Sequence, residues 1–587
     1  MWWLLFLLQD PGVLQDPGAL PPRISQAVVV SAATEPVPLD VLARAVVVIT
    51  REEIERLPRS SVADLLRLAA SVEVRSRGGF GTQSDLSVRG GGFGQVLVLV
   101  DGVRLNDSQS GHHNMDVPVA LDQIERIEIV RGTGSSLYGA DAMTATINII
   151  TAARAGVRGA LAGGEYGLVR AAASSTGTLG GITTALAAWG TRTSGFMFDR
   201  EVATGGASFS AALSPQRKVT ASHLRSAFGA NGFYGPSPSK EWTDQTLVSF
   251  ADAAGGAGRR VTVQTAYRTH GDHFLWDVAR PGFAENRHRS HAVTAAAAFR
   301  SGRERNWITL GAEAGLDWIR SNNLGDHAFG RVGLLVEHQR ALGRRTTVYP
   351  ALRYDRYSAF GDNWSPSAAA VVSLSRTVRA RLSAGRAFRV PTFTERYYRD
   401  PAHTARATLG PERAWGYDGG VDLTLGRWTA AVTPFLRRET DVIDWVRATP
   451  LEQWQTANIR AVRTLGVETG VTRTWPGGAL RAEYTWIDAD APTLTQLSKY
   501  VADYSRHSVA ASATFKVPGE VSAGVRTDCK RKADGRGYCG IDLRAARSFA
   551  RMEWFVEAAN VFDVRYQEVI GVDMPPRWIL AGVRAGR

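Results

Sequence analysis

The chain has 587 residues, more than one hydrophobic core usually supports, so two units or one large closed barrel are expected. Beyond residue 8 no run of about 18 uninterrupted apolar residues occurs, which excludes a transmembrane helix but not a transmembrane β-barrel, whose strands are apolar only at alternate positions. The net charge of +13 comes from basic residues scattered singly along the chain, and because no basic patch or aromatic RNA-binding motif occurs, no nucleic-acid partner is expected.

The first 27 residues have some features of a secretion signal. Residues 2–8 are apolar, at the lower limit of length for the hydrophobic part of a signal, and no Lys or Arg precedes them. Residues 24–27 offer small side chains of the kind found at cleavage sites. We therefore expect residues 1–27 to be a signal or leader segment, with a disordered tail as the alternative.

Residues 40–156 mix helix and strand patterns. Thr50 and Glu53 form the capping-box pattern that opens a short helix, and Ser61 and Asp64 open a second one. Apolar segments of strand length lie at 46–49, 96–100, 124–130 and 147–150. The combination predicts a small α+β domain.

Residues 157–587 show the period-two alternation of β-strands. Val467 and Val471 share one face of a strand-like segment, whereas Glu468 lies on the other. Short turns such as 476–478 alternate with longer connections such as 228–242, an asymmetry typical of outer-membrane barrels. Because Arg, Glu and Thr dominate the second face, it cannot be a protein core and must line water or a hydrated domain; a soluble propeller or jelly roll would have apolar inner faces.

The length of this second part gives the strand number. About 430 residues at about 39 residues per hairpin make about 11 hairpins, hence about 22 strands. The predicted fold class is mainly β: a transmembrane antiparallel β-barrel of about 22 strands with a small α+β N-terminal domain.

The two cysteines, Cys529 and Cys539, lie in the segment TDCKRKADGRGYCGID. The polar, Gly-containing residues between them predict an exposed loop joining two strands. In an export compartment the pair would form a disulfide, which we expect; two free thiols are the alternative. A metal site is not expected here because no His lies nearby.

Five segments carry a family resemblance. Two lie in the α+β part, LSVRGGGFGQVLVLVDGVRLND (86–107) and IERIEIVRGTGSSLYGADAMTATINIIT (124–151). Three lie in the strand-rich part: GRAFRVPTFTERYYRDP (385–401), LGPERAWGYDGGVD (409–422) and EAANVFDVRYQEV (557–569). In this order they resemble the signatures of TonB-dependent outer-membrane receptors, and the cobalamin and small siderophore receptors are nearest in length and plug pattern.

The resemblance implies that residues 40–156 form a plug inside the lumen of a barrel made by residues 157–587. It implies TonB-dependent active import of a scarce metal chelate, a siderophore or cobalamin, across the bacterial outer membrane. We expect a monomer without a resident cofactor. Its partners would be TonB with its inner-membrane energising complex, the chelate, and outer-membrane lipid and lipopolysaccharide.

The implied TonB box lies near the N-terminus, followed by a Pro-containing linker, so that residues 28–39 contain both. The box residues are Val28, Val29, Val30, Ser31 and Ala32. An apolar, β-branched segment of this kind can add as an edge strand to a partner sheet, which would let the partner pull on the chain. An ordinary strand of the plug is the alternative.

By the same resemblance, arginine–glutamate pairs hold the plug to the barrel wall. Arg89 and Arg131 occupy the family's Arg-Gly positions, and Glu412 and Glu468 fit the matching barrel positions. The strand alternation independently places Glu468 on the lumenal face, where a carboxylate suits a bidentate arginine. Generic surface charge is the alternative.

Ligand contacts would come from the plug apices 77–83 and 106–116 and from an outer loop with an aromatic platform that includes Phe228. The alternative for these aromatics is a place in the girdle at the membrane interface. The candidate ligand-binding residues are Arg77, Phe80, Thr82, Gln83, Asn106, Ser108, Gln109, His112, His113, Phe233, Tyr234 and Trp242. No metal site is predicted at His112 and His113, because no third ligand follows at a defined spacing.

Enzymatic activity is not expected, since no nucleophile-elbow, P-loop or H-E-x-x-H motif occurs. Two alternatives to chelate import remain. A receptor for another scarce nutrient, such as an oligosaccharide or a free metal, would share the architecture. A passive porin would lack the separate N-terminal domain.

Overall fold

The computed structural model describes residues 42–256, 258–303, 305–491, 495–501 and 503–586, and the backbone of two short strands before them. These are β1 (Val29–Val30) and β2 (Val37–Pro38), which pair antiparallel. The predicted leader 1–27, and Val28, Ser31 and Ala32 of the predicted TonB box, lie outside the described residues. Within the described part, no helix combines the length and hydropathy of a membrane span.

Capping chemistry fixes the first helices of the N-terminal domain. The Thr50 side chain accepts a hydrogen bond from the Glu53 amide, and the Glu53 carboxylate accepts one from the Thr50 amide at 2.8 Å. Ser61 and Asp64 form the same reciprocal pair. Both predicted helices are therefore present, although each has less than two turns.

The N-terminal domain is built on a five-stranded sheet in the order β3-β8-β9-β6-β7, in which only β6 and β9 run parallel. Its core includes the fully buried Ile49, Leu66, Ile127 and Ile147, which lie between the sheet and the helices. A separate hairpin, β4-β5, follows the second helix. The elements are β3 (Val46–Thr50), α1 (Arg51–Arg56), α2 (Val62–Leu66), β4 (Val72–Ser76), β5 (Ser84–Val88), η3 (Phe93–Gln95), β6 (Val96–Val100), β7 (Val103–Arg104), η4 (Gly111–His113), η5 (Leu121–Gln123), β8 (Ile124–Arg131), α3 (Ser135–Tyr138) and β9 (Ala145–Thr151).

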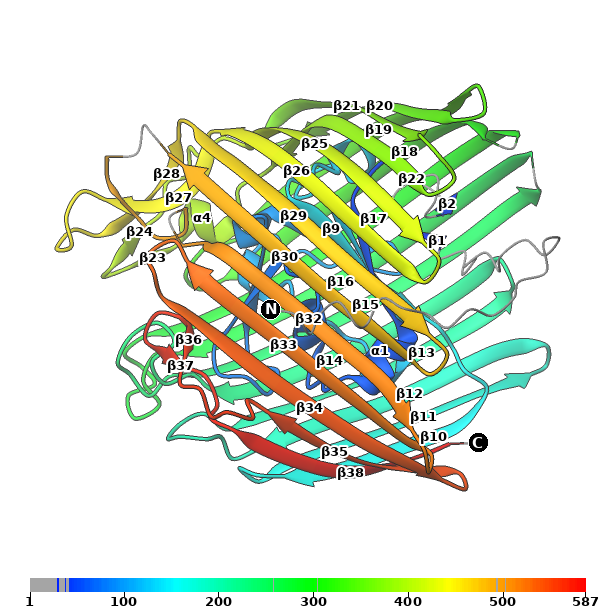
Figure 1. Cartoon of the computed structure of the whole chain (residues 1–587). Helices are drawn as coiled ribbons and strands as arrows, with labels where there is room; N and C mark the ends of the chain where they lie inside the picture. The colour runs from blue at the N-terminus through cyan, green and yellow to red at the C-terminus, as the bar shows by residue number, and fades with distance from the viewer. Residues whose placement is uncertain are drawn as a thin grey trace.

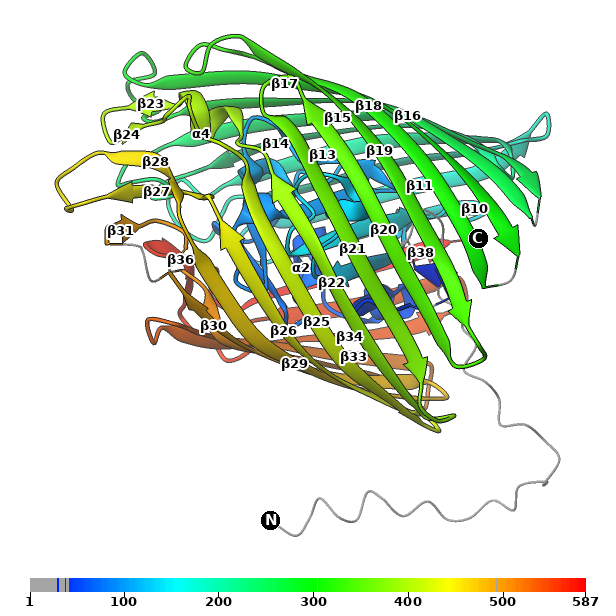
Figure 2. The same ribbon diagram turned by 90° about the horizontal axis from the view of Figure 1, so that it is seen from above.

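The rest of the chain closes into a barrel of 22 antiparallel strands, which confirms the predicted fold class. The last strand pairs with the first, from Arg158 opposite Gly586 onward, so the sheet has no free edge. Figure 2 shows the N-terminal domain, in blue, inside the barrel. The strands are β10 (Gly156–Gly164), β11 (Leu168–Leu179), β12 (Ile182–Thr193), β13 (Val202–Ser214), β14 (Arg217–Gly229), β15 (Lys240–Gly256), β16 (Arg259–Leu275), β17 (Glu285–Arg303), β18 (Asn306–Ser321), β19 (His327–Leu342), β20 (Thr346–Tyr357), β21 (Gly361–Ser373), β22 (Val378–Arg389), β25 (Glu412–Leu425), β26 (Trp428–Thr440), β29 (Val462–Trp475), β30 (Gly478–Asp490), β32 (Ser505–Val517), β33 (Val521–Lys532), β34 (Gly537–Phe549), β35 (Met552–Ala559) and β38 (Trp578–Gly586).

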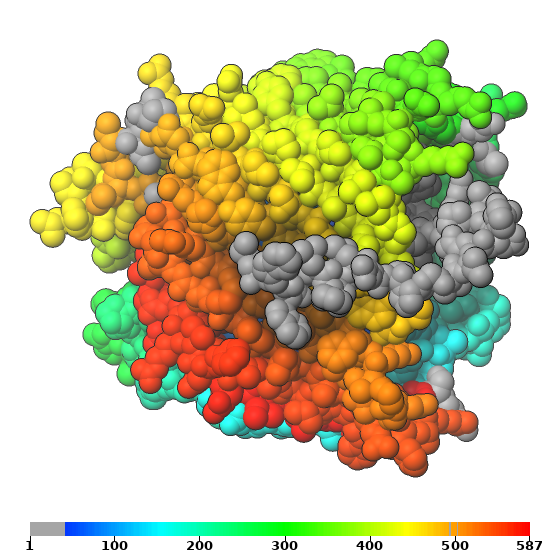
Figure 3. Space-filling view, in the orientation of Figure 1, coloured from blue at the N-terminus to red at the C-terminus, as the bar shows by residue number. Residues whose placement is uncertain are grey.

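The two ends of the barrel differ. Short turns join the strands at the right-hand end of Figure 1, whereas long connections gather at the left-hand end. The longest ones form a small sheet of their own, in the order β23-β24-β28-β27-β31, and its yellow part projects beyond the rim at the left of Figure 3. These connections contain α4 (Phe393–Tyr397), β23 (Arg399–Asp400), β24 (His403–Thr404), β27 (Val442–Arg447), β28 (Trp454–Ile459), β31 (Leu497–Ser498), β36 (Gln567–Val569) and β37 (Val572–Asp573).

Alternation along each strand separates an apolar outside from a polar inside. On β19, Val332 and Leu334 are exposed on the outer face, while Arg331 and Glu337 point inward and are buried. The inward residues are buried because the N-terminal domain fills the lumen. This domain is called the plug from here on.

Cys529 and Cys539 form a disulfide, and the loop expected between them is present but shorter than the segment that separates the two residues. They are directly opposed residues of β33 and β34, and only residues 533–536 connect the two strands. The loop is shorter than expected because Lys530 and Lys532, which look like loop residues, belong to β33, point inward and are paired by the plug. Lys530 donates to the Val72 carbonyl at 3.0 Å, and Lys532 donates to Glu73.

Substitutions on the outward face of β19 test whether this apolar face contacts the membrane. We expect Leu334→Arg, at mid-strand, to lower the free energy of unfolding by about 2–4 kcal/mol, because a charge there enters hydrocarbon. Leu342→Arg, at the short-turn end of the same strand, should cost about 0–1 kcal/mol. Urea unfolding in lipid vesicles, followed by tryptophan fluorescence, measures both variants. Equal losses at the two positions would contradict the assignment of this face to the membrane.

Candidate functional site

An arginine of the plug is anchored in a carboxylate pocket of the barrel wall. Arg89 follows β5 in a left-handed backbone conformation (φ 53°), which turns its side chain toward the wall. Its guanidinium donates to both oxygens of Glu468, at 2.7 and 2.8 Å, and also to Asp418. Arg131 lies 3.1 Å from the same Glu468 carboxylate. Burial alone would lower the pKa of Arg89, but Asp418 and Glu468 raise it above its usual value.

Glu412 contacts the plug through a different residue from those expected. It accepts a hydrogen bond from the Gln95 side chain of η3 at 2.7 Å and pairs with Arg389 of its own barrel wall. The expected partners Arg89 and Arg131 are engaged with Glu468 instead. Glu412 therefore lies at the plug–barrel interface, but it contacts the plug through the side-chain amide of Gln95 and not through an arginine of the plug.

A second arginine anchor was missed by the sequence reasoning. Arg67, which follows α2, pairs with both oxygens of Glu568, at 2.5 and 2.9 Å. The same carboxylate accepts the amide of Ser76 at 2.7 Å. Glu568 belongs to β36 in the last long connection, inside the signature segment 557–569, and that was the available sequence signal.

The apical loop 77–83 is covered by the long connections of the barrel. Arg77 pairs with Asp85 at 2.9 Å and lies over the ring of Tyr234, 5.3 Å from its centroid. The Tyr234 hydroxyl donates to the Gln83 amide oxygen at 2.5 Å. Phe80 packs on Trp578, while the Thr82 amide is used in a turn with the Gly79 carbonyl. In this structure the loop is closed over rather than open to the outside.

The predicted aromatic platform is only partly lumenal. Phe228 and Phe233 are buried in one cluster with Phe80, and their rings lie 6.0 Å apart. Trp242 does not belong to this cluster, contrary to expectation. It stacks on His273 on the outward face of β15 and β16, because the strand alternation turns its neighbour Glu241 inward instead.

Residues 106–116 form the second apical segment, and their side chains have different tasks. Asn106 uses both ends of its amide on β6, accepting from the Val98 amide and donating to the Val96 carbonyl. Ser108 contributes its carbonyl to the Phe393 amide. Gln109 donates to Asp272 of the barrel at 2.7 Å. The segment therefore fixes the plug to the wall as well as presenting its upper surface.

A cluster of aromatic and cationic side chains lies where the plug meets the long connections. We call Phe93, His112, Lys499 and Tyr500 the apical cluster. Phe93 stacks on His112 with centroids 4.3 Å apart and meets Tyr500 edge-on at 5.0 Å, and the Lys499 ammonium lies 5.7 Å from the Tyr500 centroid. Desolvation by the surrounding side chains, together with the charge of Arg77, lowers the pKa of Lys499 to about 8, although its side chain reaches solvent. Of these four residues only His112 was predicted, because 499–500 belong to a loop without a recognisable pattern.

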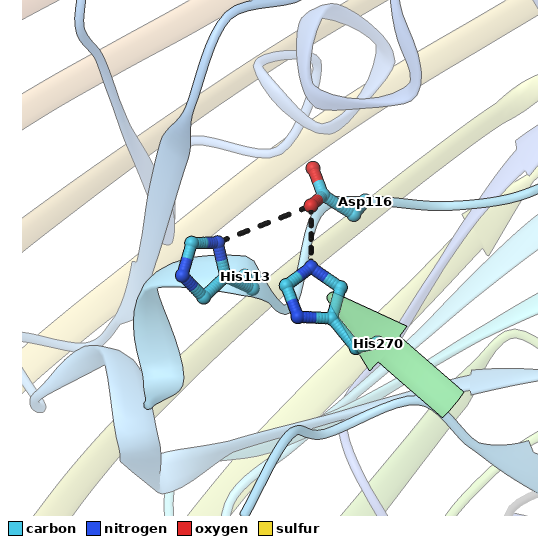
Figure 4. Close-up of side chains that lie close together, drawn as sticks. All are labelled: His113, Asp116 and His270. Atoms are coloured by element: carbon cyan, nitrogen blue, oxygen red, sulfur yellow. Dashed lines mark hydrogen bonds and ion pairs between the residues drawn. The ribbon is translucent and has the colours of Figure 1, made fainter. Parts of the chain in front are cut away.

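His113, next along the same turn, faces the barrel wall instead. Its Nδ1 lies 3.9 Å from Asp116, and its Nε2 lies 3.4 Å from Asp272 of β16. His270, also on β16, brings its Nε2 to 2.9 Å from Asp116 (Figure 4). Burial opposes protonation of His113, but Asp272 and Asp116 outweigh it and raise the pKa of His113 to about 10. His270 and Asp272 were not predicted, although their spacing on one face of β16 was a usable signal.

Two family models match the chain. Residues 154–528 match the model described as TonB dependent receptor-like, beta-barrel, and residues 38–146 match the TonB-dependent Receptor Plug Domain. Among curated proteins, the vitamin B12 transporter BtuB of Photobacterium profundum is 25% identical over 491 residues, 75% of each chain. BtuB of Vibrio vulnificus is 38% identical over 129 residues, 22% of this chain and 21% of the relative.

Solved structures share the fold at low identity. The siderophore receptor PirA from Acinetobacter baumannii superposes with a TM-score of 0.76 at 15% identity, covering 93% of this chain and 98% of that one. The FrpB iron transporter from Neisseria meningitidis gives 0.76 at 15% identity, over 93% and 100%. A ferric enterobactin receptor mutant from Pseudomonas aeruginosa, in complex with enterobactin, gives 0.74 at 16% identity, over 93% and 100%.

A substitution of Glu468, whose carboxylate is shared by Arg89 and Arg131, tests the plug anchor. We expect Glu468→Gln to loosen the plug, because it leaves Arg89 with Asp418 alone and removes the carboxylate that Arg131 contacts. Breaking a buried pair costs about 3–5 kcal/mol, and the value here should lie toward the lower end because Asp418 still pairs with Arg89. The readout is ion conductance through single proteins in planar bilayers, which should rise.

The matched control is Asp362→Asn, which removes one partner of the exposed pair with Arg356. It should leave the conductance unchanged, since exposed pairs contribute little. A Glu468→Gln protein as tightly closed as the control would contradict the role given to the anchor.

Proposed function

Because this chain belongs to the TonB-dependent receptor family, we propose that it actively imports a scarce metal chelate, a ferric siderophore or a cobalamin. The protein is a 22-strand β-barrel of the bacterial outer membrane. The observation that carries the proposal is a lumen filled by a plug that buried ion pairs hold in place. A passive porin needs an open lumen, so this arrangement disfavours that alternative.

The apical cluster is proposed as the first contact for the cargo. Aromatic faces suit a large, partly apolar chelate, and Lys499 adds a cation beside them. Arg77 and Gln83 lie in the covered apical loop and would meet cargo only after the long connections separate, whereas Tyr234 belongs to the connection between β14 and β15 and is 43% exposed. The names of the relatives support cobalamin and those of the structural neighbours support siderophores; an oligosaccharide or a free metal is the remaining alternative.

Energy must come from outside the chain, because the plug is held by buried charge pairs. Removing a charge from such a pair costs about 3–5 kcal/mol, and Arg67 and Arg89 each hold a bidentate pair. Thermal motion alone would rarely break both. We propose that TonB, energised from the inner membrane, supplies the force.

The proposed handle is the TonB box at residues 28–32. Within it, Val29 and Val30 form a two-residue pairing with Val37 and Pro38. Exchanging this short pairing for a strand pairing with TonB would lose few hydrogen bonds. The box is therefore suited to be captured without disturbing the plug.

Binding titrations of the purified protein test the cargo class. Fluorescence quenching should report saturable binding of at least one member of a panel of ferric siderophores and cobalamins. If none bound while an oligosaccharide or an uncomplexed metal ion did, chelate import would be rejected.

Deletion of residues 28–32 tests the coupling. We expect cells carrying the deletion to bind the chelate as the wild type does but to lose energised uptake, because the plug can no longer be pulled. Radiolabelled chelate, counted on energised and de-energised cells, measures both steps. Uptake that persists at the wild-type rate would contradict coupling through the TonB box.

The pH dependence of cargo affinity, which follows the charge of Lys499, distinguishes an anionic cargo from a neutral one. With a pKa of about 8, Lys499 is charged below that pH and neutral above it. Affinity for an anionic ferric chelate should therefore fall on the order of fivefold between pH 7 and pH 9, the equivalent of about 1 kcal/mol. A neutral cobalamin should show no such step.

Lys499→Arg is the matched control, because arginine keeps its charge over this range. It should bind the anionic chelate equally at pH 7 and pH 9. An identical fall in the Lys499→Arg protein would assign the step to another group.

A further inference from the structure

The wall side of the turn that carries His113 brings together metal-ligating side chains from the plug and from the barrel. Two residues of the plug, His113 and Asp116, face one residue of the barrel, His270 of β16. Their donor atoms all lie within 4.8 Å of one another, and Figure 4 shows the three side chains pointing toward a common point. We propose that these three residues bind a divalent transition-metal ion of the zinc class, which bridges the plug and the barrel wall.

The donor atoms have the spacing that such an ion needs. Zinc bonds of about 2.0–2.1 Å in a tetrahedron separate neighbouring donor atoms by about 3.3 Å. The distance from Asp116 to the His270 Nε2 is 2.9 Å, which is shorter than this separation of donor atoms. The distance from Asp116 to the His113 Nδ1 is 3.9 Å, which is longer than it. The two imidazole nitrogens also lie within 4.8 Å of each other, so the three donors surround one point from which side-chain adjustment would bring each to bonding distance. Two imidazoles and a carboxylate are also a donor set that zinc accepts, with one position left for water.

The contacts of the second ring nitrogen of each imidazole also support a metal site. Histidines that bind metals usually have a carboxylate at the other ring nitrogen, which fixes the ring and makes it a better donor. The Nδ1 of His270 lies 2.9 Å from Asp107, and the Nε2 of His113 lies 3.4 Å from Asp272. Asp107 and Asp272 are themselves held, by Arg268 and Gln109. Both rings therefore already present their free nitrogen to Asp116.

Two buried carboxylate oxygens beside the site support the proposal independently of this spacing. Asp272 Oδ1 and Glu241 Oε2 are buried and have no hydrogen-bond partner in the described part of the chain. Each of these carboxylates has an oxygen within 4.8 Å of a ring nitrogen of His113. Unpartnered carboxylate oxygens in a buried site are costly, and nearby positive charge relieves that cost.

The local charge balance favours a dication. Three aspartates face the site, and besides the two imidazoles the cation paired with them is Arg268. With neutral imidazoles the three carboxylates and Arg268 carry an excess of two negative charges, which a divalent ion cancels. The metal would thus replace the protons that the histidines otherwise hold. The three aspartates are Asp107, Asp116 and Asp272.

Release of the ion follows from where the site lies. Asp116 also lines a cavity of about 180 Å³ between the plug and the wall formed by β35, β38 and β10–β14, so one ligand of the site borders internal space. Because two ligands come from the plug and one from β16, any displacement of the plug dismantles the site. The ion therefore adds a plug–barrel link that is present only while the plug is seated. This inference does not depend on the identity of the imported cargo.

Metal titration of the purified full-length protein tests the proposal. After treatment with a chelator and dialysis, Zn²⁺ should bind with one equivalent at high affinity by calorimetry. Co²⁺ at the same site should give the visible absorption of a four-coordinate ion with nitrogen and oxygen ligands. Asp116→Asn should weaken Zn²⁺ binding by about 100-fold or more, since it removes a ligand but keeps a hydrogen-bond acceptor for His270.

Two further variants separate a metal site from a structural network. Asp107→Asn should weaken binding by about 10–100-fold while keeping one equivalent, because Asp107 is a positioning residue that acts through His270. His112→Gln is the matched control, since it removes the neighbouring imidazole of the same turn and should leave Zn²⁺ binding unchanged. Folding of every variant is checked by its heat-modifiable migration on gels, and His270→Gln repeats the ligand test from the barrel side if a plug variant does not fold.

The proposal is overturned if the wild type takes up no Zn²⁺, or if Asp116→Asn and His270→Gln bind it as tightly as His112→Gln. Chelate uptake failing at the same time would not affect this result, because the readout is metal bound to the purified protein.

Discussion

The polar inner face of the barrel is the constraint on which the rest of the structure depends. Alternation turns every second side chain of each strand into the lumen, and many of these side chains are charged. A ring of 22 strands is too wide for its own side chains to fill. Within the wall some charges pair with each other, as Arg353 does with Glu313 at 3.1 Å, but Arg353 also reaches the Leu137 carbonyl of the plug. The plug is therefore the hydrogen-bonding partner that the lumen requires.

Buried charge pairs hold the plug in a way that suits controlled release. A pair such as Arg89 with Glu468 is strong while it is dry, because the local dielectric constant is low, and weak once water reaches it. The two sides of the plug also differ. Strands β25 and β29 supply Asp418 and Glu468, whereas the cavity of about 180 Å³ lies toward β10–β14. If water from the cavity side reached these pairs when the plug is pulled, each pair that it reached would separate at lower cost.

The sequence predicted what is local or periodic. The capping boxes at Thr50 and Ser61, the strand number and the inward position of Glu468 all follow from spacing along the chain. Local sequence patterns could not predict contacts between distant segments. Arg89 and Glu468 are 379 residues apart, and only the family resemblance suggested that they form a pair. Nothing local distinguishes Glu568, which holds Arg67, from Glu412, which does not hold an arginine of the plug. The inward-facing lysines near Cys529 looked like loop residues for the same reason: the groups that pair with them lie in the plug, far away in the sequence.

The turn Gly111–His113 joins the two candidate sites. In a 3₁₀ turn successive side chains point about 120° apart, so neighbouring histidines face different surroundings. His112 stacks on Phe93 in the apical cluster, whereas His113 lies between Asp116 and Asp272 at the wall. A cargo that shifts the backbone of this turn would move His113 together with His112, because one short turn carries both. On the proposals made above, recognition of the chelate at the top of the plug would loosen the metal-bridged contact beneath it, and the first step of plug release would begin at the cargo itself.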